Sequence, residues 1–221
     1  MNIEAKHKKL LEKHLDCVLN ANKIHNLTNI KNRNEAQILH IEDSLAGILE
    51  LNQAKQGKLV DLGSGAGYPG IPLAIVSGRN TTLVESVQKK ADCLESFVHD
   101  LNLSSNIFVS NNRIEEEAVQ SRNSYAAATA RALSSISSLL ELASPLLEIG
   151  GSLICYKASE IDEELEDAQP ILDKLGMALI SNRLYGLSNG INHRIILFNK
   201  VADSDINLPR KLGLAQKRPL R

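Results

Sequence analysis

The sequence predicts an α/β fold with a doubly wound, mainly parallel sheet, on two observations. From Gln56 onward, short β-rich runs alternate with stretches long enough for crossover helices; the runs are KLVDLG, TTLVES, NIFVSN, YAAATA and GSLICYK. Two further runs, GMALISNRLYG and HRIILFNKV, are joined by a short loop containing Gly190, a pattern typical of an antiparallel hairpin at a sheet edge. The sheet is therefore expected to have seven strands.

The first fifty residues are predicted to be helical. Apolar residues recur at three- and four-residue spacing in LLEKHLDCVL, and HIEDSLAGILELN repeats the pattern. Between these two segments lies HNLTNIKNRNEA, whose asparagines interrupt the periodicity and favour a loop. We expect residues 1–52 to form a helical extension within a single domain of residues 1–221.

Composition and cysteine usage limit the class of protein. With 221 residues, 43% hydrophobic and 23% charged, the chain should bury a stable core without disulfides or metal. Cys17, Cys93 and Cys155 lie far apart and lack ligand spacing, so we expect buried thiols and no metal site. The N-terminus lacks the apolar core of a signal peptide, and no apolar run is long enough to span a membrane. A cytoplasmic monomer without a membrane partner is expected.

Charge is balanced overall but unevenly distributed. The formal net charge of -1 argues against a protein dominated by nonspecific nucleic-acid binding. Residues 160–173 carry seven acidic side chains and no basic one, and predict a solvated helix face. Residues 205–221 form a basic tail with Arg210, Lys211, Lys217 and Arg218, which is suited to phosphate contacts or is simply a basic terminus.

The segment KLVDLGSGAGYPGIPLA carries the strongest functional signal. It predicts an apolar strand, a glycine-rich turn and then a helix that Pro69 or Pro72 could start. The turn needs glycine for positive φ and for close approach of a ligand, and contains Gly63, Gly65, Gly67 and Gly70. Three of these glycines satisfy G-x-G-x-x-G, so a nicotinamide dinucleotide is one candidate cofactor.

Two acidic residues stand beside this turn, and one of them, Asp61, favours a ligand without phosphate. Asp61, two residues before Gly63, could organise the loop or accept hydrogen bonds from a ligand's ammonium group, whereas it would repel a pyrophosphate. Glu85 ends the second strand, where a carboxylate can accept from both hydroxyls of a ribose, a group that both candidate cofactors contain. We therefore expect Asp61, Gly65 and Glu85 at a cofactor site.

The glycine-rich segment resembles motif one of class I methyltransferases, which have a Rossmann-like fold and use S-adenosylmethionine. The chain as a whole resembles the small-subunit ribosomal RNA guanine-N7 methyltransferase family, also called glucose-inhibited division protein B. The ordered motifs, from about His25 to Leu220, are HNLTNI, HIEDSL, DLGSGAGYPGIPLAI, LVES, NNRIEE, ARALSS, and PRK with KRPL. The resemblance implies methyl transfer to a guanine N7 in 16S ribosomal RNA or the small ribosomal subunit.

The resemblance also implies site residues. Gly63 and Tyr68 match the family's contacts to the methyl donor, Ile114 and Glu115 match its adenine-binding turn, and Arg131 matches an arginine beside the transferable methyl. For Glu115 the plain alternative is a helix N-terminal acid, and for Arg131 a surface salt bridge. Arg131 is expected to hold the guanine through O6 or a phosphate, or to contact the cofactor.

Substrate contacts are less well marked in the sequence. Lys157-Ala158 stands where the family has Lys-Gly, and GLAQKRPL lacks the proline expected directly after Gly213. Candidate RNA contacts are Lys157, Arg194, Arg210, Lys211, Lys217 and Arg218. Because guanine N7 carries a lone pair and no proton, no general base and no catalytic residue is assigned. The alternatives are a methyltransferase with another substrate, a nicotinamide-dependent oxidoreductase, and a cofactor-binding regulatory protein.

Overall fold

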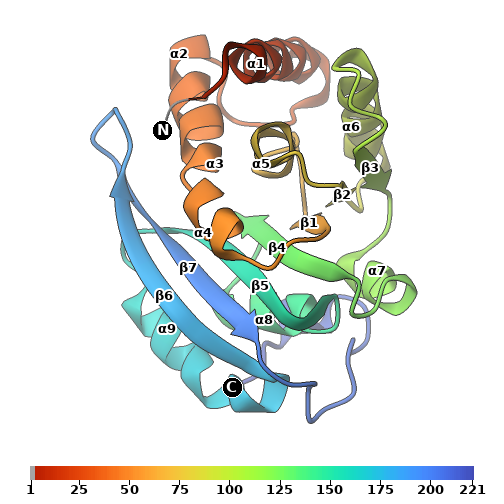
Figure 1. Ribbon diagram of the computed structural model, residues 1–221, viewed down its shortest axis with the longest axis vertical. Coiled ribbons are helices and arrows are strands. Elements are labelled where there is room, and N and C mark those ends of the chain that lie inside the picture. Colours follow the sequence, from red (N-terminus) through yellow and green to blue (C-terminus); the bar gives the residue numbers. More distant parts are fainter. Residues whose placement is uncertain (1–2) are drawn as a thin grey trace.

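The computed structural model describes residues 3–221 and contains one seven-stranded sheet between two layers of helices (Figure 1). The strands are β1 (Leu59–Leu62), β2 (Thr81–Val84), β3 (Ile107–Ser110), β4 (Tyr125–Arg131), β5 (Leu147–Ala158), β6 (Met177–Gly186) and β7 (Asn192–Lys200). Their order is β3-β2-β1-β4-β5-β7-β6, parallel from β3 to β5 and antiparallel where β7 meets β5 and β6. The predicted mainly parallel sheet with an antiparallel edge hairpin is confirmed.

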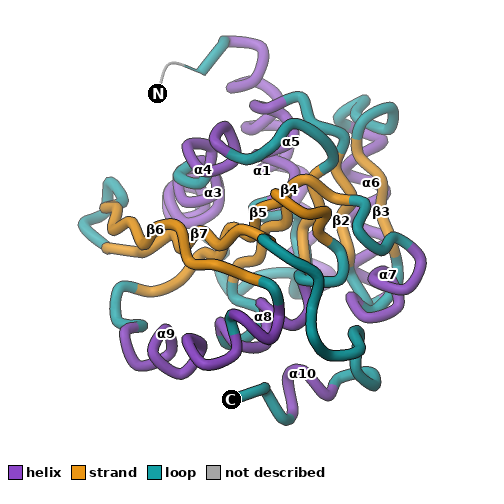
Figure 2. Tube along the Cα trace, turned by 60° about the horizontal axis from the view of Figure 1, so that its bottom comes forward, coloured by secondary structure: helices purple, strands orange, loops and turns teal. Residues whose placement is uncertain are grey.

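Helices cover both faces of the sheet. One layer contains α1 (Ala5–His25), α5 (Gly70–Ser77) and α6 (Gln88–Asp100), and the other contains α7 (Ile114–Gln120), α8 (Ile136–Ala143) and α9 (Asp162–Ala168) (Figures 1 and 2). Leu11, Leu15 and Val18 of α1 are buried in the core that α1 shares with α5 and α6. The apolar spacing that predicts this helix therefore marks its packed face.

The rest of the N-terminal segment is a chain of short helices. They are α2 (Arg33–Ala36), a π-helical segment η1 (Gln37–Glu42), α3 (Asp43–Leu45) and α4 (Ile48–Gln53). The predicted loop after α1 is shorter than expected, because the Asn32 side chain accepts hydrogen bonds from the backbone of Asn34 (2.8 Å) and Glu35 (3.2 Å) and starts α2. Within the described residues, no helix is both long and apolar enough to cross a membrane.

The central strands bring the site segments together. Leu62 at the end of β1 lies in register with Val84 of β2 on one side and with Ala130 of β4 on the other. All three strands are parallel, so the loops that follow them leave the sheet at the same edge. Residues 63–70, 85–87 and 131–134 are thereby placed side by side.

The basic C-terminal segment packs on the protein instead of extending into solvent. Leu208 and Ala215, the latter in α10 (Leu214–Lys217), are both 2% exposed. The Ser138 hydroxyl of α8 donates to the Ala215 carbonyl at 2.8 Å, and Arg122 donates to the Leu208 carbonyl at 2.6 Å. Long-range packing thus places α10 at the carboxyl edge of the sheet.

Candidate functional site

The glycine-rich loop has the left-handed backbone that its sequence predicts. Gly63, Gly65 and Gly67 have φ of 69°, 56° and 90°. A Cβ at Gly63 would lie 2.7 Å from Leu133 Cδ1, so a larger residue would clash there. A Cβ at Gly65 would meet nothing closer than the Gly63 carbonyl at 3.9 Å. The backbone at Gly65 is therefore open to a ligand, whereas at Gly63 the Cβ position is filled by the Leu133 side chain.

Asp61 organises the loop from beneath. Its side chain is fully buried, and Oδ2 accepts from the Gly70 amide at 3.1 Å, while Oδ1 has no partner. Burial raises the pKa of this carboxyl to about 6, despite the hydrogen bond from the Gly70 amide and the nearby Ser64 hydroxyl, which donates to the Asp61 backbone carbonyl at 3.1 Å. Of the two expected roles, loop organisation is the one the contacts show, and Oδ1 is left as an unpaired buried acceptor.

Glu85 closes the other side of the loop. Oε2 accepts from the Gly65 amide at 3.0 Å and Oε1 accepts from the Val87 amide at 2.9 Å. The side chain is mostly buried and borders a cavity. Because a carboxylate already binds the Gly65 amide, this loop cannot offer that amide to a pyrophosphate, as a dinucleotide-binding loop would.

A cavity of about 240 Å³, the loop cavity, lies above the glycine-rich loop. Five of the predicted cofactor residues line it: Gly63, Gly65, Glu85, Ile114 and Glu115. Sequence reasoning missed Leu133, which follows β4, and Gln216, which comes from α10. No local pattern signals Gln216, since only the fold of the C-terminal segment brings it here.

Glu115 connects the loop cavity to the C-terminal segment. Its carboxylate accepts from the Gly213 amide at 2.6 Å, across 98 residues of sequence. It also stands in the first turn of α7, as the plain helix-acid interpretation requires. Neither the adenine-binding role nor the helix-acid role of Glu115 includes this contact. The Glu115 side chain also holds the segment that precedes α10.

Tyr68 lies in a buried aromatic stack and not on the wall of the loop cavity. Its ring is 5% exposed and stacks on His40 at 4.4 Å, with His14 at 4.5 Å on the ring as well. Burial lowers the pKa of His40 to about 4 and that of His14 to about 3, so both imidazoles are neutral. The difference from the expected cofactor contact arises because α1 and η1 pack over the loop.

Arg131 forms a buried ion pair with Asp43. Nη1 donates to Asp43 Oδ2 at 2.7 Å and to the Leu39 carbonyl at 2.8 Å. Asp43 Oδ1 accepts from the Tyr185 hydroxyl at 2.7 Å and lies 2.8 Å from His193 Nδ1. Burial works to raise the pKa of Asp43, but Arg131 and these hydrogen bonds outweigh it and hold the pKa below its ordinary value. The salt bridge foreseen for Arg131 exists, but inside the protein.

A second cavity of about 520 Å³, the Arg131 cavity, lies on the other side of residues 131–134. Arg131, Asp43, Lys157 and His193 line it, and Ala132 lines both this cavity and the loop cavity. Arg131 therefore borders the second cavity and not the first. Two hollows meet at the carboxyl end of β4, where an open α/β sheet binds its ligands.

Two of the predicted RNA contacts are already paired. Lys157 Nζ donates to Glu164 at 2.6 Å and to the Ser134 carbonyl at 2.7 Å. Arg194 pairs with the exposed Asp162 at 2.9 Å. Both acids belong to α9, which sequence analysis treats as a purely solvated face.

Among the four candidate RNA contacts of the basic tail, Arg210 differs from the other three. Its guanidinium binds the buried Glu141 carboxylate with two hydrogen bonds of 2.6 and 2.5 Å. Glu141 is 2% exposed, so Arg210 compensates an interior charge and holds the segment in place. Lys211, Lys217 and Arg218 are exposed and are the tail cations available to an external phosphate.

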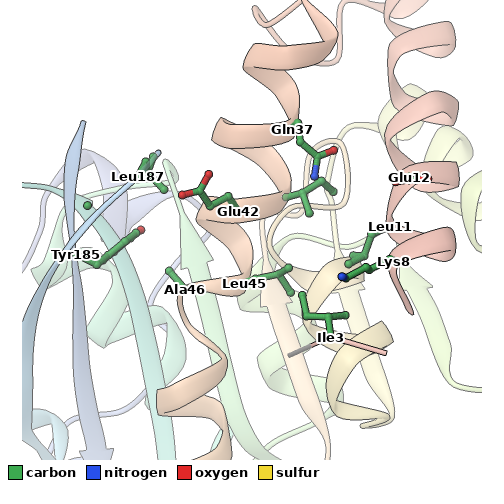
Figure 3. A pocket seen from close by; sticks show the side chains of 12 residues that line it. Ile3, Lys8, Leu11, Glu12, Gln37, Glu42, Leu45, Ala46, Tyr185 and Leu187 are labelled. Atoms are coloured by element: carbon green, nitrogen blue, oxygen red, sulfur yellow. The ribbon is translucent and has the colours of Figure 1, made fainter. Parts of the chain in front are cut away.

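A third cavity, of about 470 Å³, lies between α1, η1 and β6 (Figure 3). Its lining is mainly apolar, with Ile3, Leu11, Leu45 and Leu187 around it. None of the described residues that line it also lines the loop cavity or the Arg131 cavity. It is therefore separate from the glycine-rich loop.

The cysteines are all free thiols, and two of them are buried as expected. Cys93 and Cys155 are buried, whereas Cys17 is only partly so. Over residues 3–221, no group of three or more His, Cys, Asp or Glu side chains is arranged to hold a metal ion.

Comparison with known proteins identifies the family. Residues 7–182 match the family model described as rRNA small subunit methyltransferase G, GidB. The "Ribosomal RNA small subunit methyltransferase G" of Carboxydothermus hydrogenoformans is 34% identical, covering 100% of this chain and 94% of that protein. The protein of the same name from Oenococcus oeni is also 34% identical, covering 96% of this chain and 88% of its own.

Solved structures show the same fold at lower identity. A SAM-dependent O-methyltransferase from Thermotoga maritima aligns with a TM-score of 0.55 at 15% identity, over 73% of this chain and 65% of that chain. TYW2 from M. jannaschii, in complex with AdoMet, aligns with a TM-score of 0.55 at 17% identity, over 75% and 80%. The fold is that of class I methyltransferases. On the full-length matches, the chain belongs to the rRNA small subunit methyltransferase G family.

Proposed function

We propose that this protein transfers the methyl group of S-adenosylmethionine to N7 of a guanine in 16S ribosomal RNA. One observation supports S-adenosylmethionine as the cofactor: the carboxylates of Asp61 and Glu85 both accept hydrogen bonds from amides of the glycine-rich loop, at 3.1 and 3.0 Å. Two carboxylates around the loop favour a cationic ligand without phosphate over a dinucleotide. Family membership likewise removes the oxidoreductase alternative.

The residues of the loop cavity fit the methyl donor. The open backbone at Gly65 lets a ligand approach. Asp61 lies beneath the loop and outside the lining of the cavity, where its unpaired, buried Oδ1 adds an acceptor close to the site. Gly63, Glu85, Ile114 and Glu115 would enclose the adenosine part, while Tyr68 and Arg131 would support the wall behind the reacting methyl. When bound, S-adenosylmethionine supplies an electrophilic methyl group on a sulfonium.

The chain needs only to position the reactants and exclude water. The N7 lone pair forms a bond to carbon as the carbon–sulfur bond breaks, and the positive charge moves from sulfur to the purine. No proton is transferred, so no general base is required. The pairing of Arg131 with Asp43 at 2.7 Å leaves the adjoining cavity without a net repulsive charge, which suits a purine that becomes cationic.

The RNA is held mainly through its phosphates. Lys211, Lys217 and Arg218 are exposed on the C-terminal segment, whose Gln216 borders the loop cavity. The chain contains no Trp, four Tyr and three Phe, which argues against an aromatic platform for several bases. The proposed substrate is the RNA or the small subunit, methylated in the cytoplasm by a monomer.

The primary test is transfer of labelled methyl from S-adenosylmethionine to small subunits and to naked small-subunit RNA, both lacking this modification. Mass analysis of the nucleosides should show a single N7-methylguanosine. Transfer to another atom or another base would contradict the assignment of N7. No transfer to either substrate, despite tight cofactor binding, would favour a small-molecule substrate or a regulatory role.

A matched pair of glycine variants tests the cofactor site. Gly65 and Gly78 both have positive φ (56° and 69°), and an added Cβ would meet no atom closer than 3.9 Å at either. Ala at each position should cost about 1–2 kcal/mol of folding stability. Only Gly65→Ala puts a methyl group at the cavity, so it should weaken S-adenosylmethionine binding at least tenfold by calorimetry, with Gly78→Ala unchanged. Equal affinities would place the cofactor elsewhere.

A further inference from the structure

We propose that the Arg131 cavity receives the target guanine base and that His193, oriented by Asp43, accepts a hydrogen bond from the base's N1–H edge. This inference rests on the proposed function and names the group that distinguishes guanine from adenine. His193 lies beyond residues 7–182, the part of the chain that the family model matches. Its role follows from the geometry alone.

The position of the cavity suits the methyl acceptor. Ala132 lines both the Arg131 cavity and the loop cavity, so the two hollows adjoin at the end of β4. A donor in the loop cavity and a base in the Arg131 cavity would meet at this residue. A base stacked in a duplex or loop cannot reach such a site, so the nucleotide must turn out of its stack.

The charges of the cavity suit a base better than a phosphate. Its two permanent cations, Arg131 and Lys157, pair with Asp43 at 2.7 Å and with Glu164 at 2.6 Å. Neither cation is left uncompensated, as a phosphate site would require. The remaining walls carry the apolar and flat groups that a heterocycle packs against, including Leu39, Ile191 and the ring of Tyr156.

His193 is the polar group of the cavity that is best placed to distinguish bases. Nδ1 lies 2.8 Å from Asp43 Oδ1, and the Asp43 carboxylate is kept ionised by Arg131. The proton of a neutral imidazole is therefore assigned to Nδ1, which leaves the lone pair on Nε2 for a ligand. The side chain is 26% exposed, so the ring is accessible from the cavity.

An acceptor at this position selects guanine and leaves its reacting atom uncovered. Guanine carries N–H donors at N1 and N2, whereas adenine has a bare acceptor at N1 that would face the Nε2 lone pair. N7 lies on the Hoogsteen edge of the purine, which O6 separates from N1, so a base held by its N1–H edge leaves N7 free to face the loop cavity. This arrangement avoids the conflict that would arise if a donor occupied N7 itself.

The experiment compares His193→Ala, His193→Gln and the wild type on small subunits that lack the N7-methyl group. Gln keeps both a donor for Asp43 and an acceptor for the base. His99→Ala, an exposed histidine on α6, is the matched control. Methyl transfer gives kcat/KM for subunits, calorimetry gives the Kd of S-adenosylmethionine, and thermal unfolding verifies folding.

We expect His193→Ala to lower kcat/KM for subunits about tenfold to hundredfold, the value of one base-reading contact. The Kd for S-adenosylmethionine should stay within twofold, and His193→Gln should recover most of the loss. Reconstituted subunits with 2,6-diaminopurine at the target lack N1–H but keep N7. The wild type should discriminate against them, and His193→Ala should do so much less.

Three results would overturn the inference while leaving the proposed function intact. They are unchanged kcat/KM in His193→Ala, a loss matched by weaker cofactor binding, and equal discrimination against 2,6-diaminopurine in both proteins. If the wild type transfers no methyl group to any subunit, the proposed function fails, and the inference fails with it. Unchanged activity in His99→Ala ensures that a loss in His193→Ala is specific to that position.

Discussion

Replacing Asp61 by Asn should change how the stability of this protein depends on pH. Asp61 is fully buried under the glycine-rich loop, and burial raises its pKa from an ordinary 3.8 to about 6. Between these two values the native protein holds a proton that the unfolded chain has released. The contribution of Asp61 to the free energy of unfolding is therefore fully present below about pH 4 and is lost as the pH rises through about 6. A shift of about two units corresponds to about 3 kcal/mol.

Asn does not titrate, and its amide oxygen can still accept from Gly70. The free energy of unfolding of Asp61→Asn, relative to the wild type, should therefore shift by about 2.5 kcal/mol in favour of the variant between pH 4 and pH 7.5, since part of the full difference already lies below pH 4. Any constant cost of the new amide cancels in this comparison. The assay is urea unfolding followed by circular dichroism at five pH values, without cofactor. Asp167→Asn, on the exposed side of α9, is the control and should give a flat difference.

A difference that stays constant between pH 4 and 7.5 would refute the argument that burial dominates at Asp61. The same pair of proteins also tests the unpaired Oδ1. A ligand that binds only the native state stabilises it by an amount set by its concentration and Kd. If Oδ1 accepts from the ammonium group of S-adenosylmethionine, the cofactor should raise the melting temperature of the wild type more than that of Asp61→Asn. Equal shifts would remove Oδ1 from the site.

Three other perturbations follow from the contacts. Arg131→Ala leaves the Asp43 carboxylate buried without its cation, so the free energy of unfolding in urea should fall by about 3–5 kcal/mol. The double variant Arg131→Ala with Asp43→Asn should recover part of this stability, and no recovery would disprove the coupling. Glu115→Ala removes the acceptor of the Gly213 amide, so trypsin should cleave the C-terminal segment at least tenfold faster, and an unchanged rate would show that other contacts suffice. Lys217→Ala should weaken RNA binding and reduce the slope of log binding constant against log salt concentration by about one released counterion. An unchanged slope would exclude a phosphate contact at Lys217.

Features with local causes could be predicted from the sequence. Alternation of apolar runs with helix-length segments predicts the sheet and its hairpin, because each strand and helix carries its own periodicity. The glycine-rich loop is equally local, since positive φ at Gly63 and Gly65 requires glycine wherever the chain runs. The points at which helices begin were predicted less accurately. Helix α2 begins at Arg33, inside a predicted loop, because the Asn32 side-chain cap outweighs the polar composition of that segment.

The sequence predicted only in part which of the site residues lie together in the folded protein. Gly63, Gly65 and Glu85 follow parallel neighbouring strands, so the topology alone places them together. Tyr68 belongs to the same loop, yet its ring lies in the stack with His14 and His40. That outcome depends on how α1 and η1 pack over the loop, which no local signal in the sequence specifies.

The sequence by itself determined the α/β class, the position of the ligand-binding edge and the family, since these depend on periodicity, on glycine geometry and on motifs in fixed order. Tertiary structure alone decided which charged side chains form buried ion pairs and which stay exposed. Arg210 pairs with Glu141 across 69 residues, and Asp43 lies against His193 across 150. A charged side chain looks the same in sequence whether it faces solvent or a buried partner. Only the packed fold, by excluding water from one of these environments, distinguishes a phosphate contact from a structural ion pair.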